Sequence, residues 1–184
     1  MILGVIPARL NSTRFPSKVI FPLKGKPIIE HVYEKALQSN LLNKVIVAVD
    51  SEETKNVINC QNIIMTSDKH QSGTDRVAEV ANNFNCDIVV NIQGDEPGID
   101  PLLIDKLIQL FEDPDVEMAS IASTDLKEDD LNNDNVVKVN LDKENNAISF
   151  IRNNLNPEST YYRHIGIYAY RKNTLNLFTS LTQS

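Results

Sequence analysis

The stretch that decides the fold is ILGVIPARLNSTRFPSK, residues 2–18. It begins with a short apolar run that ends at Pro7, and it continues as a long polar segment, which together predict a buried strand feeding a functional loop. Ligands of open α/β sheets bind beyond the carboxyl ends of the strands, where this loop begins. No glycine occurs between Val5 and Lys24, so the loop is neither a Walker loop nor a GxGxxG loop.

Strand and helix patterns then alternate as far as residue 112. KVIVAV, residues 44–49, is almost continuously apolar, which is typical of a strand covered on both faces. Apolar residues at helical spacing follow Pro27, and they follow Asp100 and Pro101, which occupy N-cap and first-turn positions. The alternation predicts an α/β, Rossmann-like fold, with a mostly parallel mixed sheet and helices on both faces. The other elements of this part are strands at 62–66 and 87–93, a helix capped by Asp50 and Glu53, and a helix bearing Val77, Val80, Ala81 and Phe84.

Strand patterns dominate after residue 112. Four segments read as strands, a final helix begins near Leu175, and the acidic segment 125–135 is expected to be a solvated loop. Neither a linker nor an internal repeat is present, so we predict one domain, residues 1–184, with an α/β half at 1–112 and a strand-rich half at 113–184. The four strands are expected at 116–123, 136–141, 147–151 and 161–171.

Composition narrows the class of protein. A length of 184 residues suits one domain, and 41% hydrophobic with 23% charged residues argues against a disordered or fibrous chain. Cys60 and Cys86 lack CxxC spacing, so we expect buried thiols in a reducing compartment. The start has no signal-peptide pattern, and no run reaches the ~20 apolar residues of a membrane span. These features predict a cytoplasmic protein that does not enter a membrane.

The formal net charge of −7 conceals an uneven distribution. Residues 1–29 carry five cations and no carboxylate, which leaves −12 on the remaining 155 residues. Such a chain is expected to bind a small, highly charged anion rather than nucleic acid. Arg9 and Arg14 can hold phosphate oxygens, and Lys18 can neutralise a leaving pyrophosphate, although a solvated basic loop would contain the same residues.

VNIQGDEP, residues 90–97, is the second candidate for chemistry. A buried strand that ends at Gly94 and Asp95 places a carboxylate at the active edge of the sheet, where it could hold Mg²⁺ together with water and phosphate oxygens. Gly94 would allow a ligand to approach the backbone closely. The alternative interpretation is a turn in which Asp95 acts only as a cap.

HQSGTDR, residues 70–76, precedes a predicted helix. Ser72 or Thr74 is expected to be its N-cap. Backbone groups around Ser72 and Gly73 could equally read the polar edge of a nucleobase, and the positive end of the helix favours a nearby anion.

YYRHIGIYAY, residues 161–170, alternates with period two. The alternation places Ile165, Ile167 and Ala169 on the core side, and tyrosines with His164 on the other face. The polar aromatic face has a glycine gap between His164 and Tyr168, which suits a carbohydrate or carboxylate ligand. An exposed aromatic ladder that stabilises a pair of strands is the alternative.

Together these residues resemble the 3-deoxy-manno-octulosonate cytidylyltransferases, also called CMP-Kdo synthetases. The matching segments are IPARLNSTRFPSK, GKPIIEHV, HQSGTDRVAEV, VNIQGDEP, VVKVNLD and RHIGIYAYR, which occur in family order over nearly the whole chain. The resemblance implies a nucleotidyltransferase fold with a nucleotide-binding first half and a sugar-binding second half. It implies Mg²⁺-dependent transfer of CMP from CTP to Kdo, with release of pyrophosphate, for synthesis of the lipopolysaccharide inner core.

The resemblance also implies roles for individual residues. Catalysis would depend on positioning and charge neutralisation, because no side chain is an obvious general base. Homodimers are a further expectation. The residues implied are Arg9, Arg14 and Lys18 for the triphosphate, Ser72, Gly73 and Arg76 for the cytidine, Asp95 for Mg²⁺, and Gln93, Lys138, Arg152, His164 and Tyr168 for the acid sugar.

The sequence departs from the family pattern in three places. Ser17 replaces a usual glycine, and residues 153–156 replace a stretch that normally reads more like Ala-x-Ile-Pro. Family members also carry a sugar-contacting glutamate and a second magnesium-binding aspartate in a later segment, so the resemblance predicts a chain that lacks the family's C-terminal segment. Two alternatives follow: a relative that binds nucleotide or sugar without turnover, and a cytidylyltransferase for another acid sugar, such as a nonulosonate.

Overall fold

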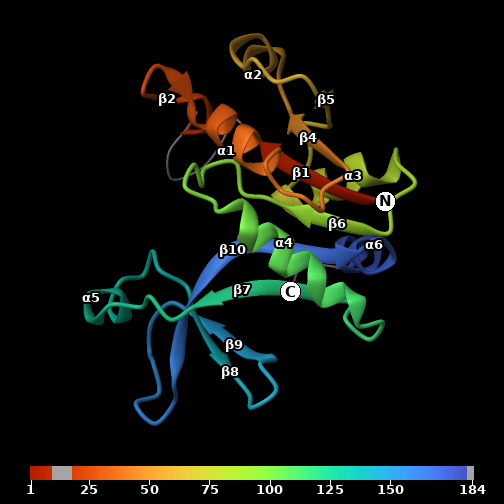
Figure 1. Cartoon of the computed structure of the whole chain (residues 1–184). Helices are drawn as coiled ribbons and strands as arrows, with labels where there is room; N and C mark the ends of the chain where they lie inside the picture. Colours follow the sequence, from red (N-terminus) through yellow and green to blue (C-terminus); the bar gives the residue numbers. More distant parts are fainter. Residues whose placement is uncertain (10–17, 182–184) are drawn as a thin grey trace. The chain divides into compact units, whose positions relative to one another are not determined.

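The computed structural model describes residues 1–9 and 18–181, which form two compact units (Figure 1). Unit 1 contains Met1–Ala119 and the residues from Ile167 onward, and unit 2 contains Ser120–Gly166. The chain passes from one unit to the other within β7, Met118–Ser123, and again within β10, Tyr161–Arg171. The functional halves expected at 1–112 and 113–184 stay a prediction.

The sheet of unit 1 has the strand order β5-β4-β1-β6-β10. Its first four strands run parallel to one another, and β10 is antiparallel to β6 through Tyr168–Arg171. This mixed sheet confirms the predicted fold class. The strand bounds are Ile2–Ala8 for β1, Lys44–Val49 for β4, Ile63–Met65 for β5 and Ile88–Asn91 for β6.

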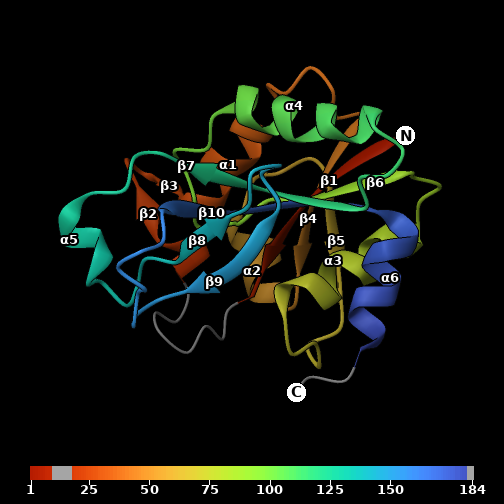
Figure 2. The same cartoon turned by 90° about the horizontal axis from the view of Figure 1, so that it is seen from below.

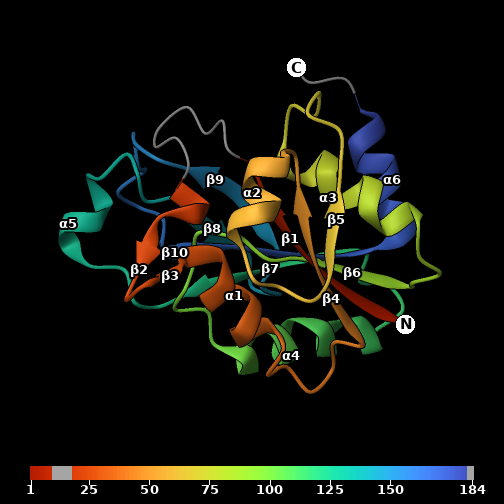
Figure 3. The same ribbon diagram turned by 90° about the horizontal axis from the view of Figure 1, so that it is seen from above.

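Helices cover both faces of this sheet, as the sequence predicts. Helices α1 and α4 lie on one face, and α3 and α6 lie on the other (Figures 2 and 3). Leu3 and Val5 of β1 pack with Val77 and Val80 of α3 and with Leu175 of α6 in one buried cluster. Each such side chain contributes about 1.5–3 kcal/mol when it is fully buried. The helix bounds are Ile28–Ala36 for α1, Glu52–Val57 for α2, Gly73–Asn82 for α3, Pro101–Gln109 for α4 and Lys172–Ser180 for α6, with 3-10 turns η1 at Lys18–Ile20 and η2 at Leu110–Glu112.

Two expected helix caps have different outcomes. Asp100 caps α4 by accepting a 3.0 Å hydrogen bond from the Leu102 amide, as predicted. The sequence predicts Asp50 as the cap of α2, but Ser51 occupies the N-cap and accepts a hydrogen bond from the Thr54 amide. The cap prediction for Asp50 is wrong because its carboxylate pairs with the buried Arg76.

A short hairpin between η1 and α1 was not expected from the sequence. Its strands are β2, Pro22–Leu23, and β3, Lys26–Pro27. Lys24 and Gly25 form the two-residue turn with φ of 51° and 81°. Positive φ at both positions matches the twist of a tight hairpin, and Gly25 meets this requirement without a steric penalty.

Unit 2 contains a small antiparallel sheet. Strands β8, Lys138–Leu141, and β9, Ala147–Ile151, pair with each other, and Tyr161–Arg163 of β10 pair with β8. The acidic segment expected to be a loop contains one short helix, α5, Glu128–Leu131. Within the described parts of the chain, no helix is long and apolar enough to cross a membrane.

Candidate functional site

Two of the expected catalytic side chains meet at the carboxyl end of the unit 1 sheet. Lys18 lies in η1 and Asp95 follows β6, and their Nζ and Oδ2 atoms are 2.9 Å apart. The side chains are 45% and 37% exposed, so solvent screening keeps the pair weak, at about 0–1 kcal/mol. The site therefore presents an ammonium and a carboxylate that ligands can reach.

Arg9 comes directly after β1 and connects the first strand to the HQSGTDR segment. Its Nη1 donates a 3.3 Å hydrogen bond to the carbonyl oxygen of Gln71, and its side chain is exposed. Arg14 lies outside the described residues, so its expected role stays a prediction.

Two glycines pack against Pro7 at the end of β1. A Cβ on Gly94 would lie 3.0 Å from the Pro7 carbonyl oxygen, and a Cβ on Gly73 would lie 3.4 Å from Pro7 Cγ. The close neighbour of Gly94 is the chain's own backbone, and the approach of a ligand to Gly94 stays a prediction. The glycines therefore bring the VNIQGDEP and HQSGTDR segments against the same residue of the first strand.

Ser72 is the N-cap of α3. Its Oγ accepts a 3.1 Å hydrogen bond from the Asp75 amide, and the Asp75 carboxylate accepts a 2.9 Å bond from the Ser72 amide. This reciprocal capping box confirms that one of the two hydroxyls caps the helix. The other hydroxyl, on Thr74, lowers the pKa of Tyr170 and so opposes the effect of burial there.

Arg76 is buried, with only 1% of its surface exposed. Its Nη1 donates to Thr66 Oγ1 and, at 3.2 Å, to the Ser67 carbonyl, while its Nη2 donates at 3.1 Å to Asp50 Oδ2. Burial lowers the pKa of the guanidinium, and Asp50 opposes that shift. These contacts connect the ends of β4 and β5, so they favour a structural role, whereas the nucleotide contact expected for Arg76 stays a prediction.

Gln93 and Tyr168 are the expected sugar contacts in unit 1. Gln93 is partly buried just after β6, and Tyr168 of β10 stands opposite Asn91 of β6. Burial raises the pKa of Tyr168, whose ring stacks on Tyr170 with centroids 6.3 Å apart.

The predicted division of β10 into a core face and a polar aromatic face is wrong at Tyr170. That side chain is 2% exposed and belongs to the core cluster beneath α3 and α6. Burial raises its pKa above the ordinary range of a tyrosine. The alternation misled because helices cover this sheet on both faces, so a polar-looking face is not an exposed one.

The other expected sugar contacts lie in unit 2. His164 Nε2 is 2.8 Å from Ser120 Oγ, the Phe150 ring meets the His164 ring edge-on at 4.9 Å, and burial lowers the pKa of His164. Arg152 Nη1 donates a 2.9 Å hydrogen bond to the Asp134 carbonyl. Lys138 is fully buried.

The ammonium of Lys138 donates to three backbone carbonyls, those of Asn133, Val136 and Arg152. An ammonium has three donors, so these bonds use all of them. The contacts favour a structural role for Lys138, while its expected part in sugar binding stays a prediction.

Sequence reasoning missed the residues that hold the segment before α3. Asp50 pairs with Arg76, and Glu79 Oε2 accepts a 3.0 Å bond from the Ser67 amide and contacts His70 Nε2. Burial raises the pKa of Glu79, but the hydrogen bonds from His70 and Ser67 outweigh burial and lower it overall. No local pattern indicates the pairing of Asp50 with Arg76, because the two residues are 26 positions apart.

Comparison with solved structures defines the class of protein. The chain is similar over its whole length to a CMP:2-keto-3-deoxy-manno-octonic acid synthetase complexed with CTP, with a TM-score of 0.91 and 36% identity, and it covers 79% of that chain. The chain, with its mixed, mostly parallel sheet and charged side chains at the carboxyl edge, therefore has a nucleotidyltransferase fold.

Comparison of sequences gives the family. The cytidylyltransferase family model matches residues 3–184. The 3-deoxy-manno-octulosonate cytidylyltransferase of Pelobacter propionicus is 39% identical, over 98% of this chain and 78% of its own length. The corresponding protein of Thermodesulfovibrio yellowstonii is 40% identical, over 98% and 79%. The chain belongs to the cytidylyltransferase family, among the 3-deoxy-manno-octulosonate cytidylyltransferases.

Proposed function

We propose that this cytidylyltransferase transfers CMP from CTP to 3-deoxy-D-manno-octulosonate (Kdo) with release of pyrophosphate, for synthesis of the lipopolysaccharide inner core. The observation that carries the proposal is the Lys18–Asp95 pair at the carboxyl edge of a sheet whose fold matches a CTP-bound synthetase at a TM-score of 0.91. The relatives named above support the choice of sugar.

The nucleotide would be held by the carboxyl ends of β1 and the start of α3. Arg9, Arg14 and Lys18 would neutralise the triphosphate, because guanidinium and ammonium groups match phosphate oxygens. Backbone groups at Ser72 and Gly73 would contact the cytidine. The N-terminus of α3 adds a positive electrostatic potential that favours an anionic ligand.

Asp95 would bind Mg²⁺. Mg²⁺ is commonly held by one or two carboxylates with substrate phosphates and water completing the octahedron, and an accessible carboxylate beside a phosphate-binding lysine fits that requirement. Across residues 1–9 and 18–181, no cluster of three or more His, Cys, Asp or Glu side chains could hold a metal alone. When bound, the ion would supply charge neutralisation to the triphosphate.

The candidate sugar contacts are Gln93 and Tyr168 in unit 1, and Arg152 and His164 in unit 2. Lys138 would act only indirectly, because its three donors are bound to backbone carbonyls. An amide and a phenol can exchange hydrogen bonds with sugar hydroxyls, and a guanidinium can pair with the sugar carboxylate. His164 is expected to act as the neutral imidazole near pH 7, because burial lowers its pKa.

In the reaction, the anomeric hydroxyl oxygen of Kdo attacks the α-phosphorus of CTP. The bond from that phosphorus to the bridging oxygen of pyrophosphate breaks, and the hydroxyl proton passes to solvent. Arg9 and Lys18 hold the phosphates in line for attack, and Lys18 neutralises charge that moves onto the leaving pyrophosphate. Catalysis rests on this alignment and on charge.

The test is pyrophosphate release from CTP and Mg²⁺ with Kdo, with a nonulosonate and with no acceptor. Of the three conditions, we expect pyrophosphate release only in the one that contains Kdo. We expect Asp95→Asn to lower kcat at least about 100-fold. Asp115→Asn is the matched control, because Asp115 is an exposed carboxylate in a loop outside the site.

The other outcomes are distinct. Release only with a nonulosonate would replace the sugar and keep the reaction. If the protein binds CTP but releases no pyrophosphate with any acid sugar, the proposed catalytic activity is wrong. The chain would then be a relative that binds nucleotide without turnover. Full activity of Asp95→Asn would overturn the metal assignment alone.

A further inference from the structure

Two segments of unit 1 converge on the buried guanidinium of Arg76. One contributes Asp50, directly after β4, and the other contributes Thr66 and Ser67, directly after β5 on the way to α3. We propose that Arg76, with Asp50 as its counter-ion, is a positioning residue that holds residues 67–72 in the geometry that binds CTP. This inference rests on the CTP binding proposed above.

Glu79 extends the same arrangement by one helical turn. It lies three residues after Arg76 in α3, and its carboxylate accepts from the Ser67 amide and contacts His70. Arg76 thus binds the carbonyl of Ser67 while Glu79 binds its amide. Two charged side chains of α3 therefore hold the segment that leads to the N-terminus of their own helix.

The held segment connects to the phosphate-binding side of the site. The carbonyl of Gln71 accepts the hydrogen bond from Arg9, and the next two residues are Ser72 and Gly73, which packs against Pro7. Displacement of residues 67–71 would therefore move a partner of Arg9 and the expected cytidine contacts together. A shift of about 1 Å in such positioning groups can cost a large factor in binding or rate.

The proposal predicts the direction in which CTP affinity changes when the charge of Asp50 is removed. A buried arginine needs a paired carboxylate, and the buried Nε of Arg76 already has no partner among the described residues. Neutralising Asp50 would weaken the bond that fixes the guanidinium and loosen residues 67–72, which weakens CTP binding. If Arg76 itself bound phosphate, the loss of Asp50 would leave more positive charge for the anion, and CTP binding would strengthen.

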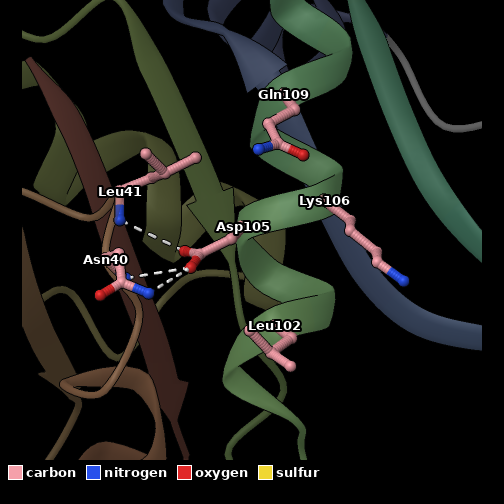
Figure 4. Close-up of a pocket in the computed structure, with 6 residues that line it drawn as sticks. All are labelled: Asn40, Leu41, Leu102, Asp105, Lys106 and Gln109. Carbon is pink, nitrogen blue, oxygen red and sulfur yellow. Dashed lines mark hydrogen bonds between the residues drawn. The ribbon is translucent and has the colours of Figure 1, made fainter.

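The α1–β4 loop supplies a matched control at the opposite end of β4. The carboxylate of Asp105 in α4 is largely buried and accepts hydrogen bonds from the amides of Asn40 and Leu41 (Figure 4). Asp50→Asn and Asp105→Asn thus remove the same charge from two carboxylates that hold loops, one partly buried and the other buried. Only Asp50 belongs to the arrangement around residues 67–72.

The experiment measures CTP affinity by calorimetry without acceptor, together with urea unfolding of each variant. We expect Asp50→Asn to weaken CTP binding about tenfold and Arg76→Lys to weaken it less, while Asp105→Asn stays within about twofold of wild type despite a comparable loss of stability. In the complete reaction, Asp50→Asn should raise the KM for CTP and leave the KM for the acid sugar unchanged. Glu79→Gln, at a more exposed position, gives the same test should Asp50→Asn fail to fold.

The contrary results are separable. Unchanged or tighter CTP binding by Asp50→Asn, or an equal loss in Asp105→Asn, overturns the positioning role and leaves the proposed function intact. Wild-type protein that binds no CTP overturns the proposed function, and the positioning role with it.

Discussion

At the scale of single residues, Lys18 and a divalent cation are expected to compete for the carboxylate of Asp95. The Lys18 ammonium already contacts the Asp95 oxygen that would bind a divalent cation. A cation that approaches nucleotide-free protein must therefore displace the ammonium or bind beside it. Phosphate groups of CTP would draw Lys18 away, so cation and nucleotide are expected to favour each other's binding.

Removing the charge of Lys18 should strengthen cation binding in the absence of nucleotide. We expect Lys18→Met to tighten Mn²⁺ binding about fivefold, which corresponds to about 1 kcal/mol, as measured by the paramagnetic resonance signal of free Mn²⁺. Lys26→Met is the control, because Lys26 pairs with Glu34 elsewhere. Weaker Mn²⁺ binding by Lys18→Met would show that Lys18 does not compete for Asp95.

The lowered pKa of His164 makes stability depend on pH. The folded protein binds this proton less readily than the unfolded chain does, whose ordinary pKa is 6.5, so the neutral ring contributes stability above pH 6.5 that is lost as pH falls through the folded pKa. Urea unfolding between pH 8 and pH 4 should show a smaller acid loss for His164→Gln than for wild type. Parallel pH profiles would contradict the prediction.

Both thiols should be unreactive in the folded protein. Burial, with the nearby charges of Glu30 and Glu34, raises the pKa of Cys60 to about 12, and burial raises the pKa of Cys86. Almost no thiolate exists at pH 8, and the thiolate is the nucleophile. A thiol-disulfide dye should label both cysteines quickly in urea and very slowly without it; rapid labelling of folded protein would be the opposite result.

At the scale of elements, the turn after β6 is fitted closely to β1. A side chain at Gly94 would meet the Pro7 carbonyl at 3.0 Å, and a backbone oxygen cannot move aside as a flexible side chain can. The tight contact of Gly94 therefore restricts the position of the next residue, Asp95, relative to β1.

Gly94→Ala should therefore destabilise the protein by about 1–3 kcal/mol, measured by urea unfolding. Gly98→Ala is the control, because no atom lies within 4 Å of the added Cβ. Equal stability of the two variants would mean that the turn shifts without cost.

The elements that local patterns encode could be predicted from the sequence, and long-range partners could not. The apolar run at Lys44–Val49 and the Asp100 cap depend on neighbouring residues, so both were predicted correctly. Asp50 was misassigned because its partner is Arg76, 26 residues away, on another element. In the site, sequence reasoning selected Lys18 and Asp95, but nothing in the spacing of residues 18 and 95 indicates that they form an ion pair.

At the scale of the whole molecule, the two units differ in the size of their buried cores. Unit 1 contains the helix-covered sheet and its large core, whereas Lys138 and Val139 are the only residues described in unit 2 that are almost completely buried. A small core leaves local opening inexpensive.

Hydrogen exchange should therefore separate the units. We expect the amides of β4 to be protected at least about 100-fold more than those of β8 and β9, when mass spectrometry follows exchange in the folded protein. Similar protection in all three strands would indicate that both units open only in global unfolding.

Lys138 gives unit 2 a built-in cation. Its buried ammonium is bound by the carbonyl oxygens of residues 133, 136 and 152, and carbonyl oxygens also coordinate potassium in potassium channels. A covalently tethered ion cannot be diluted away or exchanged for sodium. The loops around it should therefore keep their geometry whichever monovalent salt surrounds the protein.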